Sequence, residues 1–370
     1  MDKFIPVAIP HFSGNERKYV NDCLDTTWVS SVGKYISMFE AAFADFLGVR
    51  HALSCCNGTV ALHLPLLVWG IGPGDEVIVP TATYIATANA VRYCGATPVF
   101  ADCLPDTWNI DPSDIERKIT SRTKAIIPVH LYGNPCDMDA IMAIAEKHGL
   151  YVLEDAAECH GATIGGRMTG AIGHAATFSF FGNKIITCGE GGMVVTNDTA
   201  MAEKMRTLKG QGMDPNRRYW FTEVGYNYRM TNIEAALGLA QLENIETHIA
   251  NRRKVATWYM EELAGHRELI EFQVPTEDAD PVWWMFSILL SKHVCVSRDE
   301  VMLKLKEDGI ETRPLFYPMH VMPPYFDPNA EYPVSEDVMS RGMNLPTHAM
   351  LTRDDVTYIC TQLINHAKGQ

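Results

Sequence analysis

KAIIPVHLYGNPCDMDAIMAIAEKHGLYVLEDAA, residues 124–157, holds two apolar runs on either side of a helical pattern. The runs at 124–133 and 150–157 are continuously apolar, which is typical of strands covered on both faces. Residues 136–149 read as a helix that ends in a His-Gly stop signal. A strand, a helix and a second strand in this order predict a parallel sheet with helices on its faces.

The same alternation extends along the first two thirds of the chain. It predicts an α/β domain with a mostly parallel, doubly covered sheet, whose further strands are expected at 76–80, 97–102, 176–181 and 192–198. A long charged helix is expected over 232–265, followed by a smaller mixed region with a strand at 283–291 and helices at 297–309 and 352–367. We therefore expect a large domain over 1–245, which includes the N-terminal segment, and a small domain over 246–370.

One residue conflicts with its predicted element. Pro65 falls inside the apparent helix at 58–70, where it is expected to kink or break the helix.

Composition excludes several classes of protein. With 31 Lys and Arg against 45 Asp and Glu, the net charge of −14 disfavours nucleic acid and anionic lipid as partners. No apolar run approaches the roughly 18 residues of a membrane span, and the first residues do not resemble a signal peptide. The ten cysteines form no CxxC pair, and the histidines lack metal-ligand spacing. We expect a cytoplasmic protein with reduced thiols, no metal site and no membrane partner.

Three groups of residues carry candidate chemistry. Asp155 ends an apolar strand, so its carboxylate is expected either to face a cation or strong donor or to cap the next helix. Asn-Gly-Thr at 57–59 opens a helix whose free amides can bind phosphate, although any helix with an Asn cap looks similar, and Ser179 can add a hydroxyl. Lys184 is either an ordinary surface lysine or, because apolar neighbours lower an amine pKa, a neutral nucleophile. An amine, a buried acid and a phosphate cradle together favour pyridoxal phosphate (PLP) as cofactor.

Eight segments in order carry a resemblance to a known family. The chain resembles the DegT/StrS group of PLP-dependent sugar aminotransferases through TTWVSSVGKYISMFE, NGTVALHL, GDEVIVPTATYIATANAV, VHLYGNPCDMD, LEDAAECHGA, FSFFGNKIITCGEGGMVVTND, GYNYRMTN and ETRPLFYPMH. The resemblance implies the fold of aspartate aminotransferase type I, with a seven-stranded, mostly parallel sheet in the large domain and a smaller mixed C-terminal domain. It also implies a homodimer.

The resemblance assigns a role to each candidate residue. Lys184 is the Schiff-base lysine and Asp155 the partner of the pyridine nitrogen. Phosphate is held by Gly58, Thr59 and Ser179, together with Asn227 from the neighbouring subunit. Tyr84 stacks on the cofactor ring, although without the family it reads as a core tyrosine at a strand end. Glu158 and His160 fill positions beside the cofactor, and His160, Arg313 and His320 are the substrate residues, with a structural salt bridge as the alternative for Arg313.

The resemblance also implies a reaction. Segments 26–40 and 311–320 match members that transfer the amino group of L-glutamate to C4 of GDP-4-keto-6-deoxy-D-mannose, giving GDP-perosamine for cell-surface polysaccharide such as O-antigen. A dTDP- or UDP-linked keto-hexose is the main competing substrate. Two other activities stay open: a PLP-dependent sugar dehydratase, which replaces the lysine by histidine, and a non-catalytic ligand-sensing relative. Lys184 argues against the first, and the retention of Asp155, Ser179 and Lys184 argues against the second.

Overall fold

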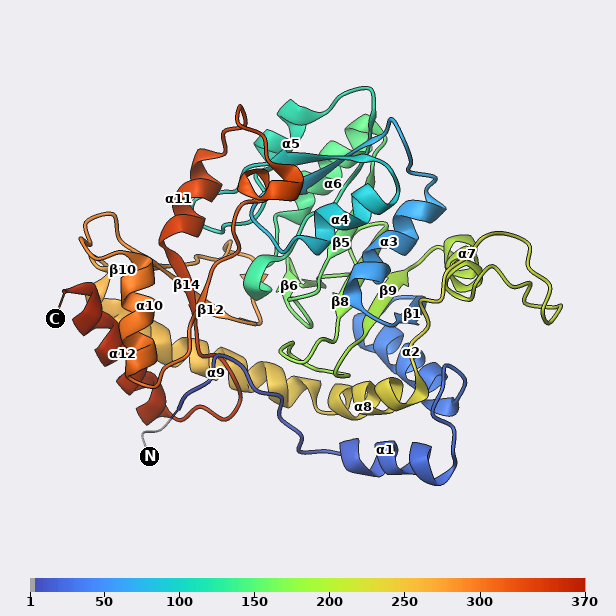
Figure 1. The fold of residues 1–370 in the computed structure, drawn as a ribbon, viewed down its shortest axis with the longest axis horizontal. Coiled ribbons are helices and arrows are strands. Elements are labelled where there is room, and N and C mark those ends of the chain that lie inside the picture. Colours follow the sequence, from blue (N-terminus) through green and yellow to red (C-terminus); the bar gives the residue numbers. More distant parts are fainter. Residues whose placement is uncertain (1–3, 370) are drawn as a thin grey trace.

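A seven-stranded sheet forms the centre of the larger part of the molecule (Figure 1). The structure is a computed structural model that describes residues 4–369. In sheet order the strands are β1 (His51–Cys55), β9 (Gly192–Thr196), β8 (Ala175–Ser179), β5 (Tyr151–Asp155), β4 (Thr123–Ile126), β2 (Glu76–Pro80) and β3 (Thr97–Ala101). Only β9 runs antiparallel to its neighbours, β1 and β8. The predicted α/β class with a mostly parallel sheet is confirmed.

Helices cover both faces of this sheet because successive side chains of a strand point to opposite faces. In β2, Val77 and Val79 join the apolar cluster under α3 (Gly58–Val68), α4 (Ala86–Tyr93) and α7 (Thr199–Lys209). Ile78, between them, joins the cluster under α5 (Pro112–Lys118) and α6 (Met138–His148). At the β1 edge, α2 (Lys34–Leu47) and α8 (Asn232–Leu242) pack with α1 (Glu16–Asp25).

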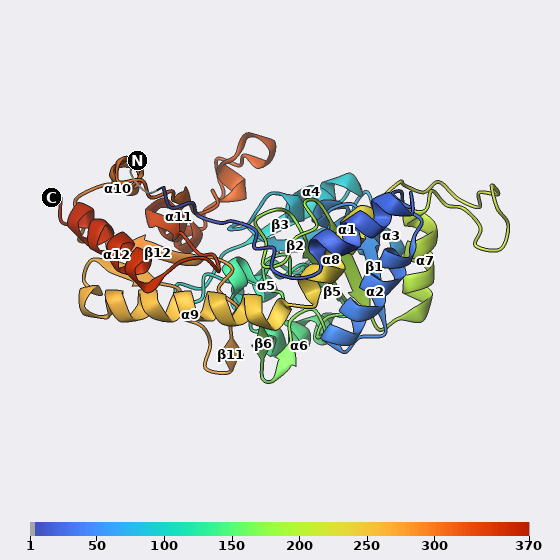
Figure 2. The ribbon, with the colours of Figure 1, turned by 90° about the horizontal axis from the view of Figure 1, so that it is seen from below.

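The remainder of the chain builds a second, smaller unit on the other side of the molecule (Figure 2). Its antiparallel sheet has the order β10 (Ile270–Phe272), β12 (Phe286–Leu290), β14 (Gly342–Leu345) and β13 (Arg313–Pro314). Its core lies under α9 (Ile245–Leu263), α10 (Arg298–Glu307) and α12 (Arg353–Ala367). A third, three-stranded sheet contains β11 (Ala279–Asp280), β6 (Thr163–Ile164) and β7 (Arg167–Met168).

The N-terminal segment contacts the smaller unit. Ile5 pairs with Ile310 of that unit, so the N-terminal residues do not belong to the larger unit alone. The division of the chain at residue 245 stays a prediction.

Within residues 4–369, the helices are too short or too polar to cross a membrane.

Two predictions about helices were wrong. The helix expected over 232–265 is two helices, α8 and α9, which meet at Glu243 and Asn244. Glu243 accepts hydrogen bonds from Asn15 and Tyr19, so contacts with the distant N-terminal segment lie at the break. Conversely, α3 continues through Pro65. The helix is buried on most sides, and its packing offsets the one hydrogen bond that proline removes.

A carboxylate of the larger unit caps a helix of the smaller unit. Asp102, directly after β3, accepts hydrogen bonds from the backbone N–H groups of Val334 and Ser335 and from the Ser335 hydroxyl, at 3.1, 2.8 and 2.6 Å. These groups open α11 (Pro333–Arg341), whose first amides have no partner inside the helix.

Removing this cap is expected to destabilise the protein. Asp102→Ala should lower the free energy of unfolding by about 1–3 kcal/mol, because it leaves several donors without an acceptor. Asp102→Asn keeps an acceptor oxygen and should lose less. Urea unfolding of the two variants tests this, and an alanine variant as stable as wild type would show that the contact contributes nothing.

Candidate active site

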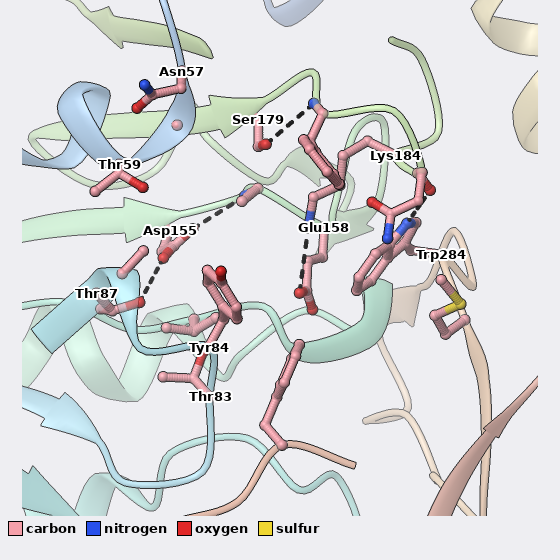
Figure 3. Close-up of a pocket in the computed structure, with 18 of the residues that line it drawn as sticks. Asn57, Thr59, Thr83, Tyr84, Thr87, Asp155, Glu158, Ser179, Lys184 and Trp284 are labelled. Atoms are coloured by element: carbon pink, nitrogen blue, oxygen red, sulfur yellow. Dashed lines mark hydrogen bonds and ion pairs between the residues drawn. The ribbon is translucent and has the colours of Figure 1, made fainter. Parts of the chain in front are cut away.

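A cavity of about 470 Å³ opens where the carboxyl ends of β5 and β8 meet the first turn of α3. Ligands in open α/β sheets bind at such strand ends. The cavity brings together eight of the residues that the sequence singles out, and most of them are drawn in Figure 3. They are Gly58, Thr59, Tyr84, Asp155, Glu158, Ser179, Lys184 and Arg313.

The residues predicted to bind phosphate lie together at one end of the cavity. Asn57 caps α3 by accepting a hydrogen bond from Val60 N, so the residues that follow it form the first turn. A Cβ on Gly58 would lie only 3.0 Å from Ser179 Cβ, so glycine allows the serine hydroxyl to approach the helix N-terminus. With the Thr59 hydroxyl beside it, this end of the cavity offers amides and hydroxyls to an anion.

Asp155 is the last residue of β5, and its carboxylate faces α4. Thr87 Oγ1 donates to Oδ2 at 2.8 Å, and Ala157 N donates to Oδ1 at 3.2 Å. Burial raises the pKa of this carboxyl, while the two hydrogen bonds oppose the shift. Since both donors are neutral, a cation beside Asp155 would stabilise its charged form. No helix follows β5, so the alternative reading of Asp155 as a helix cap is wrong, and its bond to Ala157 N belongs to a local turn.

Lys184 lies on the other side of the cavity in Figure 3, beside Glu158. Its Nζ is 3.5 Å from Glu158 Oε1, and the other oxygen of Glu158 accepts a hydrogen bond from Tyr132 N at 2.8 Å. Burial lowers the pKa of the Lys184 amine, whereas Glu158 and Asp155 oppose that shift. The side chain is 11% exposed, so it is not an ordinary surface lysine. A buried amine with a lowered pKa is suited to nucleophilic attack and to proton transfer.

Two predicted residues border the open side of the cavity. Tyr84 is 58% exposed and packs against Phe316 of the smaller unit, with ring centroids 5.7 Å apart. It is therefore not the core tyrosine that its position at a strand end suggests. Arg313, in β13, lines the cavity and also pairs with Glu311 at 3.5 Å, so both of its predicted roles agree with its placement.

The structure corrects the substrate roles predicted for two histidines. His160 is fully buried among core rings, with its centroid 5.3 Å from that of Phe178, and burial lowers its pKa to about 3. His320 is also buried, within hydrogen-bond distance of Thr81 Oγ1 and Glu336 Oε1, at 2.9 and 3.1 Å. Neither residue lines the cavity. Both were placed near the substrate by the family resemblance, and both rings are buried in the packed interior instead.

Asn227 also lies away from the cavity of its own chain. It sits at the base of a segment, residues 210–228, that projects from the body of the molecule in Figures 1 and 2. Gly210 and Asn227 pair across this base, and the Asn227 Oδ1 accepts a hydrogen bond from Arg229 at 3.1 Å.

Two residues of the site were missed by the sequence analysis. Thr87, in α4 and three residues after Tyr84, donates to Asp155, and no local pattern in the sequence indicated this contact. Trp284 lines the cavity next to Lys184, with Nζ 3.9 Å from the centroid of its ring. No local pattern distinguishes Trp284 from its neighbour Trp283.

These groups fit PLP. The α3 end of the cavity suits a phosphate, the buried Asp155 suits a protonated ring nitrogen, and the Lys184 amine suits the aldehyde carbon. The cavity volume lies within the usual range of small-molecule sites.

Comparisons with known proteins agree with this fit. A model of the DegT/DnrJ/EryC1/StrS aminotransferase family matches residues 10–364. The chain is 55% identical over 360 residues to a Caulobacter vibrioides protein named GDP-perosamine synthase, covering 97% of both chains. It is 49% identical over 361 residues to an Escherichia coli O157:H7 protein of the same name, covering 98% of both. The crystal structure of S. venezuelae DesV in complex with a ketimine intermediate superposes with a TM-score of 0.90 at 36% identity, over 96% of this chain and 94% of DesV. The chain therefore belongs to the DegT/DnrJ/EryC1/StrS aminotransferase family and is a PLP-dependent sugar aminotransferase.

Proposed function

We propose that the protein transfers the amino group of L-glutamate to C4 of GDP-4-keto-6-deoxy-D-mannose, giving GDP-perosamine and 2-oxoglutarate. The observation that carries this proposal is the identity of 55% and 49%, over almost the full length, to two proteins named GDP-perosamine synthase. The cofactor residues alone do not choose a sugar, because they serve every substrate of such an enzyme. Because the sequence identity to these two proteins extends over both units, it also covers the segments outside the cofactor cradle, which can choose the sugar.

Six residues of the cavity have a part in this reaction. Gly58, Thr59 and Ser179 bind the cofactor phosphate, and Asp155 holds a proton on the ring nitrogen. When bound, PLP carries the amino group between the two substrates and accepts the electron pair freed at the reacting carbon. The neutral Nζ of Lys184 accepts a proton from Cα of glutamate, and the same atom later returns a proton at C4 of the sugar. Glu158, 3.5 Å away, stabilises the amine while it carries the extra proton.

The open side of the cavity suits the nucleotide sugar. Arg313 is 44% exposed there, and a guanidinium recognises diphosphate oxygens with paired hydrogen bonds. Tyr84 offers a ring face at the same opening. The reacting amine lies deeper, so the sugar end would enter first and the nucleotide would remain near the surface.

We also propose that the active form is a homodimer in which Asn227 contributes to the phosphate site of the partner. Two groups of exposed apolar side chains support this. One lies on and between α1 and α2 and includes Trp28 and Val32; the other lies on the projecting segment 210–228 and includes Tyr219 and Val224. A second copy of the chain would cover such surfaces.

Asn227→Ala is expected to weaken PLP binding roughly tenfold or more, since it removes one hydrogen bond to the charged phosphate, worth about 1.5–3 kcal/mol. Cofactor titration followed by absorbance measures this. Arg229→Ala, which removes the neighbour that bonds to Asn227, provides the comparison. An active monomer in sedimentation at assay concentration, or unchanged PLP affinity, would refute the shared site.

A competition experiment tests the substrate. Equal amounts of GDP-4-keto-6-deoxy-D-mannose and dTDP-4-keto-6-deoxy-D-glucose are added to purified protein with PLP and L-glutamate. The two amino sugar products are then quantified by mass spectrometry. We expect the GDP-linked product to dominate, because the ratio of the two products reports the ratio of the two kcat/KM values. A preference for the dTDP sugar would overturn the choice of substrate but leave the aminotransferase activity in place.

A further inference from the structure

Trp284 makes two separate contacts with the lysine loop. Its ring centroid is 3.9 Å from Lys184 Nζ, and its indole Nε1–H donates to the backbone oxygen of Asn183 at 2.8 Å. Asn183 directly precedes Lys184, so a single side chain contacts both the amine and the backbone that carries it. Figure 3 shows Trp284 beside Lys184, on the side of the cavity away from Asp155.

Trp284 is itself firmly held. It is 5% exposed, and its backbone oxygen accepts a hydrogen bond from the buried Arg252 at 2.8 Å. Its ring stacks on Tyr132, with centroids 6.3 Å apart and planes 18° from parallel. Tyr132 N in turn donates to Glu158, the carboxylate that pairs with Lys184. The indole and the carboxylate on either side of the amine therefore belong to one connected group of contacts.

A lysine that is not attached to the cofactor needs such support. Its side chain has several rotatable bonds, so a free amine would sample many positions in the cavity. An aromatic face attracts an ammonium group, and the attraction is stronger where water is excluded. A proton transfer requires the amine near the reacting carbon in a narrow range of positions.

We propose that Trp284 is a positioning residue for Lys184, whose indole holds the free amine against Glu158 and fixes the loop that carries it. The inference rests on the proposed role of Lys184 as the lysine that binds PLP. The titratable groups that act on the amine are Glu158 and Asp155, and the amine in turn helps to lower the pKa of the buried His160. Glu158 and Asp155 remain when Trp284 is replaced, so a change in the amine follows from the loss of the indole and of its contacts with the lysine loop and Tyr132.

The experiment uses full-length protein loaded with pyridoxamine phosphate, in which Lys184 is free. Acetylation of Lys184 by acetic anhydride is followed by peptide mass analysis between pH 6 and pH 10, a range set by the ordinary pKa of lysine at about 10.4 and its shift on burial. Trp284→Met removes the ring that favours the charged amine. Its acetylation profile should therefore move to lower pH, with Lys184 reacting severalfold faster at neutral pH. Trp284→Phe keeps an aromatic face and should shift less.

Kinetics supply the second readout. Trp284→Met should lower kcat by roughly tenfold to a hundredfold, the cost of misplacing a catalytic group, while KM for the nucleotide sugar stays near the wild-type value. Trp284→Phe should recover part of kcat. Trp284→Leu also lacks the ring but differs in shape, so it replaces the methionine variant if that one does not fold.

Trp258→Met is the matched control. Trp258 lies in α9 with Lys254 Nζ 4.9 Å from its ring, outside the residues that line the cavity, and its loss should leave the Lys184 profile unchanged. If Trp284→Met and Trp284→Leu retain both the wild-type profile and kcat, the positioning role is wrong. Borohydride labelling of the PLP-loaded wild type separates this failure from a failure of the proposed role of Lys184, which is contradicted if the label is on another residue or is absent.

Discussion

Lys184→Ala is expected to reduce aminotransfer by at least about 10³-fold, because it removes the group that both binds PLP and moves the proton. The only amine among the residues that line the cavity is Lys184, so no neighbour there can replace it. Steady-state rates with glutamate and the keto sugar measure the loss. The variant should remain folded, since Glu158 loses a cation but keeps its hydrogen bond from Tyr132 N.

Lys147→Ala is the control for this experiment. Lys147 is 65% exposed and pairs with Glu116 on the surface, so its loss should change the rate very little. A Lys184→Ala protein with more than a few per cent of wild-type activity would contradict the assigned role.

The second large effect is expected for Asp155→Asn. The substitution keeps the shape of the side chain and one acceptor oxygen but removes the negative charge that holds a proton on the ring nitrogen. We expect kcat to fall by about 10²–10³-fold, the usual loss when a buried electrostatic contact in an active site is removed. PLP binding should weaken as well, because the ring nitrogen loses its charged partner.

Thr87→Val tests the same carboxylate indirectly. Thr87 Oγ1 stabilises the charged form of Asp155, so its removal should raise the carboxyl pKa further. As the pH is lowered, Thr87→Val should lose activity at a higher pH than the wild-type protein does, because its Asp155 is protonated at a higher pH. Thr87→Ser retains the donor and should behave as wild type. Equal pH profiles for the valine and serine variants would contradict this.

Much of the fold was predictable because it depends on local patterns. Runs of apolar residues marked the strands of the central sheet, and the helix expected at 297–309 is present as α10, which opens with a Ser297–Glu300 capping box. Asp155 and Lys184 were also found from the sequence, the first because it ends a buried strand and the second because it interrupts an apolar stretch. Both signals lie within a few residues of the functional group.

The features that escaped prediction depend on distant contacts. The break between α8 and α9 lies where Glu243 bonds to Asn15 and Tyr19, more than two hundred residues earlier. Trp284 reaches Lys184 from 100 residues further along the chain, across the boundary between the two units. Such contacts follow from tertiary packing, which local propensity does not contain.

The histidines show the opposite error. His160 follows Asp155 by five residues and lies near the site in sequence, yet the turn after β5 directs its ring into the core beside Phe178 and Phe180. His320 lies in a segment that was predicted to contact substrate, and its ring instead bridges Thr81 and Glu336. Proximity in sequence located the region of the site in both cases but not the direction of the side chain.

Borohydride reduction of the PLP-loaded protein tests the central claim most directly. The reaction fixes the cofactor covalently to the amine that binds it, and peptide mass analysis then identifies the residue. We expect a phosphopyridoxyl group on Lys184 and none on the Lys184→Ala variant. A label on another lysine, or none on the wild-type protein, would contradict the assignment of this cavity as the active site.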